Sequence, residues 1–142
     1  MEGSRDESSL RCYFEVANPQ AAEGEWRRPL EGDAPNLNEL AAAAGGRSGV
    51  VWKLEASGDL NANLVRFDAG GGVGEHVNQE LDVVFVGVAG SGLVRVEAEE
   101  HPLSAGTLVF VPRGARRSTV SLSDGFAYLT VHRRRGPLKI GG

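Results

Sequence analysis

The segment GGGVGEHVNQELDVVFVGVAG, residues 70–90, determines the fold expected for this chain. It opens on three glycines, reaches His76, and then runs through apolar and β-branched residues to Gly90. A second segment, GTLVFVPRGARRSTVS, follows at residues 106–121 and holds Pro112 between two glycines. A continuous apolar run bounded by glycine is typical of a strand covered on both faces. Both segments therefore predict short strands separated by turns.

The chain has the same character from residue 49 onward. Short runs rich in β-branched residues recur, among them GVVWKLEA, ANLVRFDA, LVRVEA, RSTVSLS and FAYLTVH. The sequence Ser123-Asp124-Gly125 separates the last two runs and predicts a tight hairpin turn between them. Regularly spaced short strands with glycine-rich turns favour an all-β sandwich or closed barrel.

The residues before this region differ in composition. Residues 11–16, RCYFEV, are compatible with an edge strand, and the sequence NELAAAA predicts a short helix. Asn36 or Asn38 would cap this helix and Gly45 would end it. We expect the helix to pack against the barrel or a partner subunit, because so short a helix is marginal alone. The expected divisions are a disordered tail at 1–10, an N-terminal arm at 11–48, a barrel at 49–135 and a C-terminal tail at 136–142.

Composition limits the classes of function. The chain has 142 residues, which suits one domain, and its net charge of −4 argues against nucleic-acid binding. Its one cysteine, Cys12, excludes an intramolecular disulfide. We expect no signal peptide and no membrane span, since no apolar run approaches the roughly 20 residues that a span requires. The expected location is cytoplasmic.

The two segments together resemble the motifs of the cupin family. The family's first motif is Gly, five residues, His-x-His, three or four residues, Glu, six residues and Gly. Its second is Gly, five residues, Pro-x-Gly, two residues, His, three residues and Asn. The scaffold positions that match are Gly70, His76, Gly90, Gly106, Pro112 and Gly114. The resemblance covers roughly residues 60–133 and implies a single jelly-roll barrel that forms a homodimer.

The metal-ligand positions of the family pattern are mostly replaced. Residues i and i+2 of a strand share a face, so His76 and Asn78 keep the geometry of the two motif histidines. Asn78 is a weak neutral ligand, Val83 at the Glu position has no donor atom, and Arg117 at the third His position is cationic. The family set suits divalent iron, manganese, nickel or zinc. We therefore expect no bound metal and predict no cofactor.

Three other side chains are candidates for a rearranged metal site. Asp82 lies one position from the Glu position and would face away unless the strand bulges. Glu80 shares the parity of His76 and would face inward if the strand extends so far. The predicted hairpin turn places His132 on the face opposite to Arg117. If a metal is present, its expected ligands are His76, Asn78 and Asp82.

The preferred hypothesis is a binding module that holds a small organic ligand without a catalytic metal. Its polar contacts would be His76, Asn78 and Arg117. Its apolar wall would be Val83, Phe85, Leu108 and Phe110. Arg117 either faces the pocket, where it could pair with a carboxylate or phosphate, or extends its head into water. Other arginines, at 113, 116 and 133–135, add to a positive field that could guide an anionic ligand.

Two further hypotheses stay open. One is a metal-dependent dioxygenase, isomerase or decarboxylase with a rearranged ligand shell. The other is a structural barrel that is filled by its own side chains and acts through association.

Overall fold

A computed structural model of the chain describes residues 34–55 and 57–134. The chain divides into two units, and every helix and strand given below lies within residues 36–142. The elements in chain order are α2 (Leu37–Ala43), β1 (Gly49–Lys53), β2 (Leu60–Phe67), β3 (Gly72–Val77), β4 (Val83–Ala89), β5 (Ser91–Val96), β6 (Glu99–Ser104), β7 (Leu108–Val111), β8 (Arg116–Ser121) and β9 (Phe126–Arg133). The predicted tail at 1–10, edge strand at 11–16 and tail at 136–142 lie outside the described residues.

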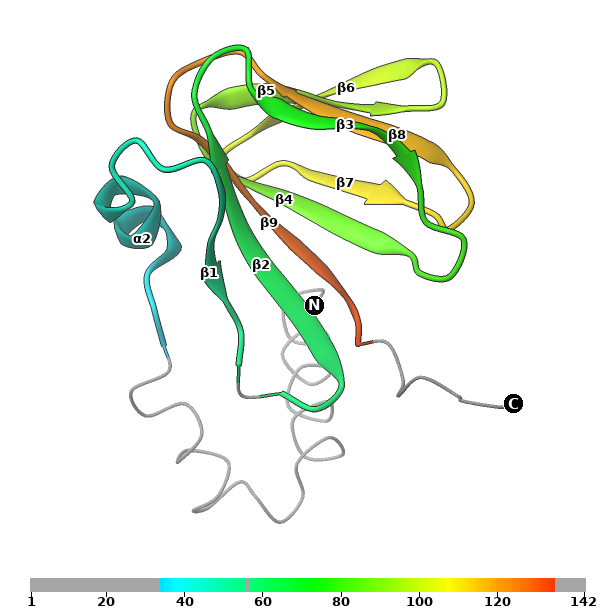
Figure 1. The fold of residues 1–142 in the computed structure, drawn as a ribbon, viewed down its shortest axis with the longest axis horizontal. Coiled ribbons are helices and arrows are strands. Elements are labelled where there is room, and N and C mark those ends of the chain that lie inside the picture. Colours follow the sequence, from blue (N-terminus) through cyan, green and yellow to red (C-terminus); the bar gives the residue numbers. More distant parts are fainter. Residues whose placement is uncertain (1–33, 56, 135–142) are drawn as a thin grey trace, which may run out of the picture. The chain divides into compact units, whose positions relative to one another are not determined.

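The strands form two antiparallel sheets that face each other (Figure 1). The five-stranded sheet has the order β1-β2-β9-β4-β7, and the four-stranded sheet has the order β3-β8-β5-β6. The predicted all-β jelly-roll barrel with one short helix is confirmed. No helix in the described part of the chain is long and apolar enough to cross a membrane.

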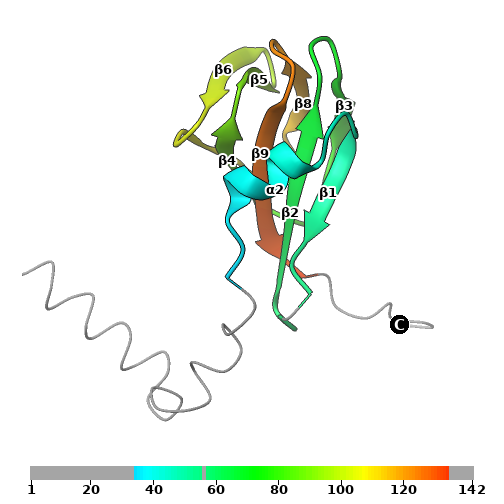
Figure 2. The same ribbon diagram turned by 90° about the vertical axis from the view of Figure 1, so that its left-hand side faces the viewer.

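Helix α2 covers the outer face of the five-stranded sheet (Figure 2). The side chain of Asn36 caps the helix by accepting a hydrogen bond from the Glu39 backbone N–H at 3.0 Å. The helix buries Ala41 against Leu64 of β2 and Ala127 of β9, which confirms that it packs on the barrel. Its stability therefore comes from apolar contact with the sheet as well as from its alanines.

The main core lies between the two sheets, where inward-facing residues alternate with outward-facing ones. On β4, Val83 and Phe85 are buried. On β9, Phe126 and Tyr128 are almost completely buried, and their ring centroids lie 5.2 Å apart. The tight connection from β4 to β5 passes through Gly90, whose φ of 68° is in the left-handed region that favours glycine.

The predicted hairpin between β8 and β9 is wrong. The two strands belong to different sheets, and the segment around Ser123–Gly125 connects one sheet to the other. Two carboxylates hold this connection against the loop after β2. Asp124 accepts a hydrogen bond from the Ala69 N–H at 3.0 Å, and Asp68 accepts one from the Gly125 N–H at 3.1 Å. The turn-forming residues therefore connect two different sheets instead of two neighbouring strands of one sheet. As a result, the side chains of β8 and β9 can face each other across the core.

Candidate functional site

A cavity of about 210 Å³ lies between the two sheets. Its apolar wall consists of Val65, Val73, Val83 and Phe85. Its polar lining consists of His76, Asn78, Arg117, Thr119, Tyr128, Thr130 and His132. The three residues predicted for ligand binding, His76, Asn78 and Arg117, are thus brought together around one cavity.

Arg117 is the charged group in the lining of this cavity. Only 3% of its surface is exposed, so the alternative in which its head extends into water is wrong. Its Nε donates a hydrogen bond to the Ala115 carbonyl at 3.2 Å, while its buried Nη2 has no hydrogen-bond partner among the described residues. Burial lowers the pKa of this guanidinium from its ordinary value, yet an arginine remains cationic at neutral pH. The cavity therefore carries a fixed positive charge.

His76 and Asn78 lie beside Arg117 at the edge of the four-stranded sheet. His76 of β3 is the antiparallel partner of Arg117 on β8. The Nδ1 of His76 lies 2.9 Å from the Gly74 carbonyl oxygen. Because a carbonyl oxygen can only accept a hydrogen bond, Nδ1 carries the proton. In the neutral ring, Nε2 is then free to accept a hydrogen bond. The Oδ1 of Asn78 accepts hydrogen bonds from the Glu80 and Leu81 N–H groups at 2.9 and 3.1 Å. Its amide nitrogen is left as the group that can donate to a ligand.

Three polar residues of the lining, Thr119, Tyr128 and Thr130, were not predicted to belong to it, and His132 was a candidate only for a rearranged metal site. Thr119 follows Arg117 by two positions on β8, and the other three occupy alternate positions on β9, so strand parity was the signal that could have found them. The Tyr128 hydroxyl lies 3.1 Å from the Thr119 hydroxyl, which also accepts a hydrogen bond from the Val73 N–H at 3.1 Å. This network fixes the tyrosine in the wall of the cavity.

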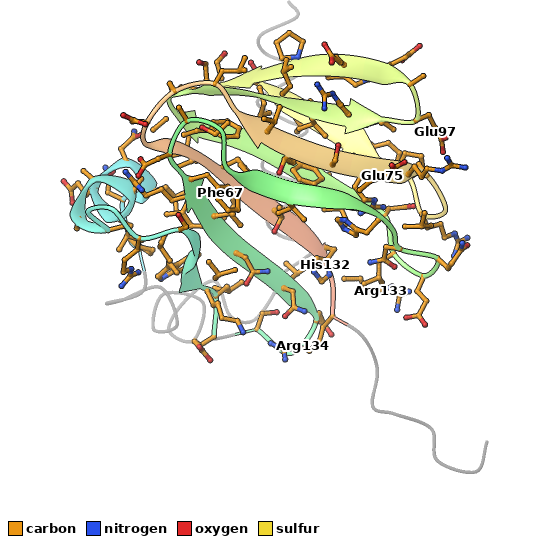
Figure 3. All side chains as sticks on the ribbon, turned by 45° about the horizontal axis from the view of Figure 1, so that its top comes forward. Phe67, Glu75, Glu97, His132, Arg133 and Arg134 are labelled. Atoms are coloured by element: carbon orange, nitrogen blue, oxygen red, sulfur yellow. The ribbon has the colours of Figure 1, made fainter. Side chains whose placement is uncertain are left out.

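The position of His132 corrects a prediction. The expected hairpin register pointed His132 away from Arg117, but His132 lines the same cavity, near the end of β9 (Figure 3). The reason is that β8 and β9 face each other from separate sheets instead of pairing. The His132 Nδ1 lies 2.8 Å from the Arg133 carbonyl, which holds the ring at this end of the strand.

Two residues predicted for the apolar wall do not belong to it. Leu108 and Phe110 of β7 are 59% and 52% exposed, while Val109 and Val111 face the core. The prediction assigned Leu108 and Phe110 to the inward face of β7, whereas Val109 and Val111 occupy that face. A shift of one residue along a strand moves every side chain to the other face. Val83 and Phe85 line the cavity as expected.

The residues around the cavity do not fit a catalytic metal of the kind that the resemblance implies. Asp82 accepts a hydrogen bond from the Arg113 N–H at 2.8 Å and, with Glu80, lines a separate surface groove. Neither carboxylate therefore reaches the cavity. No group of three or more His, Cys, Asp or Glu side chains that could hold a metal occurs among the described residues. His76 and His132 share their cavity with a buried cation, which would repel a second one.

The remaining arginines of the predicted positive field lie outside the cavity. Arg113, Arg116, Arg133 and Arg134 are exposed. Arg135 lies outside the described residues. Arg116 borders a larger open hollow of about 480 Å³ on the four-stranded sheet, where Glu75 and Glu97 also lie (Figure 3). Its side chain lies 3.8 Å from the Glu75 carboxylate, and its backbone N–H donates to Glu97. Arg117 lines this hollow as well as the inner cavity, so its guanidinium lies between the two, and it differs from Arg116 in being buried.

Tyr128 provides a test of the environment in the cavity wall. Burial raises the pKa of its phenol above the ordinary value of 10.0, and the hydrogen bond with Thr119 opposes part of that rise. Above pH 10.0 the unfolded chain loses this proton while the folded chain keeps it, so the free energy of unfolding should fall as the pH rises. Tyr13→Phe leaves Tyr128 as the remaining tyrosine. In that variant, tyrosinate absorbance should have a higher midpoint in the folded protein than in urea, and equal midpoints would contradict this description.

Comparisons with known proteins agree with the fold and the motifs. The sequence model described as a cupin domain matches residues 63–132. Among curated proteins, none gave a significant match to the chain.

Solved structures give many significant matches. The structure of KdgF from Halomonas sp. is 25% identical with a TM-score of 0.56, and the match covers 60% of this chain and 77% of that one. TT1209 from Thermus thermophilus is 26% identical with a TM-score of 0.57, and the match covers 72% of this chain and 97% of that one. A cupin-2 domain containing protein from Shewanella frigidimarina has the same fold at 16% identity, with a TM-score of 0.59 and coverage of 74% and 99%. The motif positions, the two-sheet barrel and these matches together show that the chain belongs to the cupin family.

Proposed function

We propose that this cupin binds a small organic ligand in the cavity between its sheets and does so without a catalytic metal. The observation that carries the proposal is the composition of the cavity lining. An apolar wall of Val65, Val83 and Phe85 faces convergent polar groups that include Arg117 and Tyr128. Ligand sites in proteins combine a mostly apolar wall with a few placed polar groups in this way.

The size of the cavity limits the ligand. At about 210 Å³ it is smaller than the roughly 300–1,000 Å³ of sites that take drug-sized molecules. The ligand would therefore be a small metabolite. A scaffold role in which side chains fill the barrel is less well supported, because the lining leaves this volume open.

A metal-dependent reaction is also less well supported, because Asp82 and Glu80 are directed to another groove. Titration with divalent iron, manganese, nickel and zinc tests this point directly. Near-stoichiometric binding of any of these ions that is lost in His76→Ala would contradict the metal-free proposal.

A thermal-shift screen of small acids, amides, alcohols and sugars tests the binding itself. A compound at 100 times its dissociation constant should stabilise the protein by about 2.7 kcal/mol. Thr130→Phe places a ring in the cavity and should abolish this shift, since Thr130 belongs to the lining.

The matched control is Val131→Phe, because the adjacent residue on β9 points to the opposite face and lies outside the lining. Its ligand-induced shift should equal that of the unmodified protein. A shift that Thr130→Phe leaves intact would place the ligand elsewhere, and a cavity that none of these compounds occupies would end the proposal.

A further inference from the structure

The buried charge of Arg117 has no counter-ion among the described residues. Among these residues its guanidinium makes one hydrogen bond, from Nε to the Ala115 carbonyl, and no carboxylate forms a salt bridge with it. A guanidinium has five N–H groups to donate. A charged group that is removed from water without a partner is strongly destabilised, so proteins normally pair such groups.

The other buried arginine in the described part of the chain follows that rule. Arg66 is 8% exposed, and its Nη2 lies 2.9 Å from the Asp68 carboxylate. Its Nη1 donates to the Arg47 carbonyl at 3.0 Å. Arg117 is more deeply buried, at 3% exposed, and it has neither a carboxylate nor a partner for Nη2 among the described residues. The difference between the two is that Arg117 borders a cavity.

We propose that the cavity ligand is a small monocarboxylate whose carboxylate group serves as the counter-ion of Arg117. This inference rests on the proposed function, since it names the class of molecule that the same cavity takes. The planar guanidinium fork matches the two oxygens of a carboxylate and forms paired, charge-assisted hydrogen bonds with them. Arg117 alone supplies a permanent positive charge among the residues of the lining, so one negative charge on the ligand balances it.

The rest of the lining indicates the body of the ligand. The side chains of Val65, Val73, Val83 and Phe85 offer apolar contact. In a small branched or aromatic acid, the carboxylate would pair with Arg117 while the hydrocarbon part packs against these apolar side chains. A phosphate ester fits less well, because its second charge would have no permanent cation in the lining to meet it.

Matched pairs of acid and amide test the carboxylate itself. The pairs are isobutyrate with isobutyramide and benzoate with benzamide. The two members of each pair differ in charge but have nearly the same shape. Calorimetric titration should show that at least one acid binds the unmodified protein at least tenfold more tightly than its amide. Inorganic phosphate is included as a competitor, and it should displace the acid only weakly.

Variants at Arg117 test the role of the residue. Arg117→Met keeps a long side chain without charge, and it should weaken binding of the acid at least tenfold while leaving the amide unchanged. Arg117→Lys keeps the charge but not the planar fork, and it should retain part of the preference for the acid. The control is Arg116→Met, since Arg116 is exposed and absent from the cavity lining, and its acid affinity should match that of the unmodified protein.

The outcomes separate this inference from the function on which it rests. If amides bind as tightly as acids, and Thr130→Phe still removes both, the cavity binds ligands but the carboxylate assignment is overturned. Phosphate that binds more tightly than every acid overturns the assignment as well. If neither acids nor amides bind in a manner sensitive to Thr130→Phe, both the inference and the proposed function fail.

Discussion

Gly87→Ala should lower the free energy of unfolding by about 3 kcal/mol or more. A Cβ at this position of β4 would lie 1.9 Å from the backbone carbonyl oxygen of Ser104. The contact is with backbone, so no side chain can rotate away to relieve it.

Hydrogen bonds fix the two segments that meet at Gly87. The Gly87 N–H donates to the Thr107 carbonyl at 2.8 Å, and the Gly106 N–H donates to the Gly87 carbonyl at 2.9 Å. Separating the segments by the distance that a methyl group needs would break these bonds. Each lost bond that leaves a buried group unpaired adds about 1–3 kcal/mol.

Gly74→Ala is the matched control for this prediction. Gly74 also lies on a strand, but a Cβ there meets no atom within 4 Å. Its effect on unfolding should be within about 0.5 kcal/mol. Denaturant unfolding of the three proteins measures both effects, and equal losses for the two variants would contradict the close approach of β4 to the segment at 104–107.

The prediction of the fold from sequence depended on local signals and succeeded where those were sufficient. The helix cap, expected at Asn36 or Asn38, is formed by Asn36, and the runs GVVWKLEA and ANLVRFDA contain the strands β1 and β2. The sequence Ser123-Asp124-Gly125 was a strong hairpin signal, yet the segment joins two sheets. Asp68 and Asp124 hold that crossing through contacts with residues 57 and 55 positions away in the chain. Such distant partners leave no local pattern.

The candidate site was predicted in part for the same reason. His76, Asn78 and Arg117 were found because they occupy positions of a known motif, and the structure places them together. Tyr128, Thr130 and His132 belong to β9, whose orientation toward β8 depends on the sheet to which each strand belongs. The parity of β7 was assigned wrongly because Leu108-Val109-Phe110-Val111 is apolar at every position, so its sequence does not show which face is buried.

The second large effect is expected at Arg117, and it has the opposite sign. Arg117→Met should raise the free energy of unfolding of the ligand-free protein by about 2 kcal/mol. Replacing a buried ion pair by apolar side chains of similar volume is often neutral or stabilises the protein by about 1–4 kcal/mol, and an unpaired charge lacks even the attraction of a partner. The loss of the hydrogen bond to the Ala115 carbonyl, worth about 1 kcal/mol, opposes the gain but does not cancel it.

Arg117→Lys is the control, because it keeps a buried charge of similar reach. Denaturant unfolding without ligand should show a higher midpoint for the methionine variant and no gain for the lysine variant. An unchanged midpoint in Arg117→Met would mean that water in the cavity already solvates the guanidinium. Arg117 would then lower the stability of the ligand-free protein while it lines the cavity. Such a cost is expected where ligand binding requires the charge, because functional sites often reduce the stability of a protein. The stability gain and the loss of acid binding in one variant would therefore have a single physical cause, the unpaired charge of Arg117.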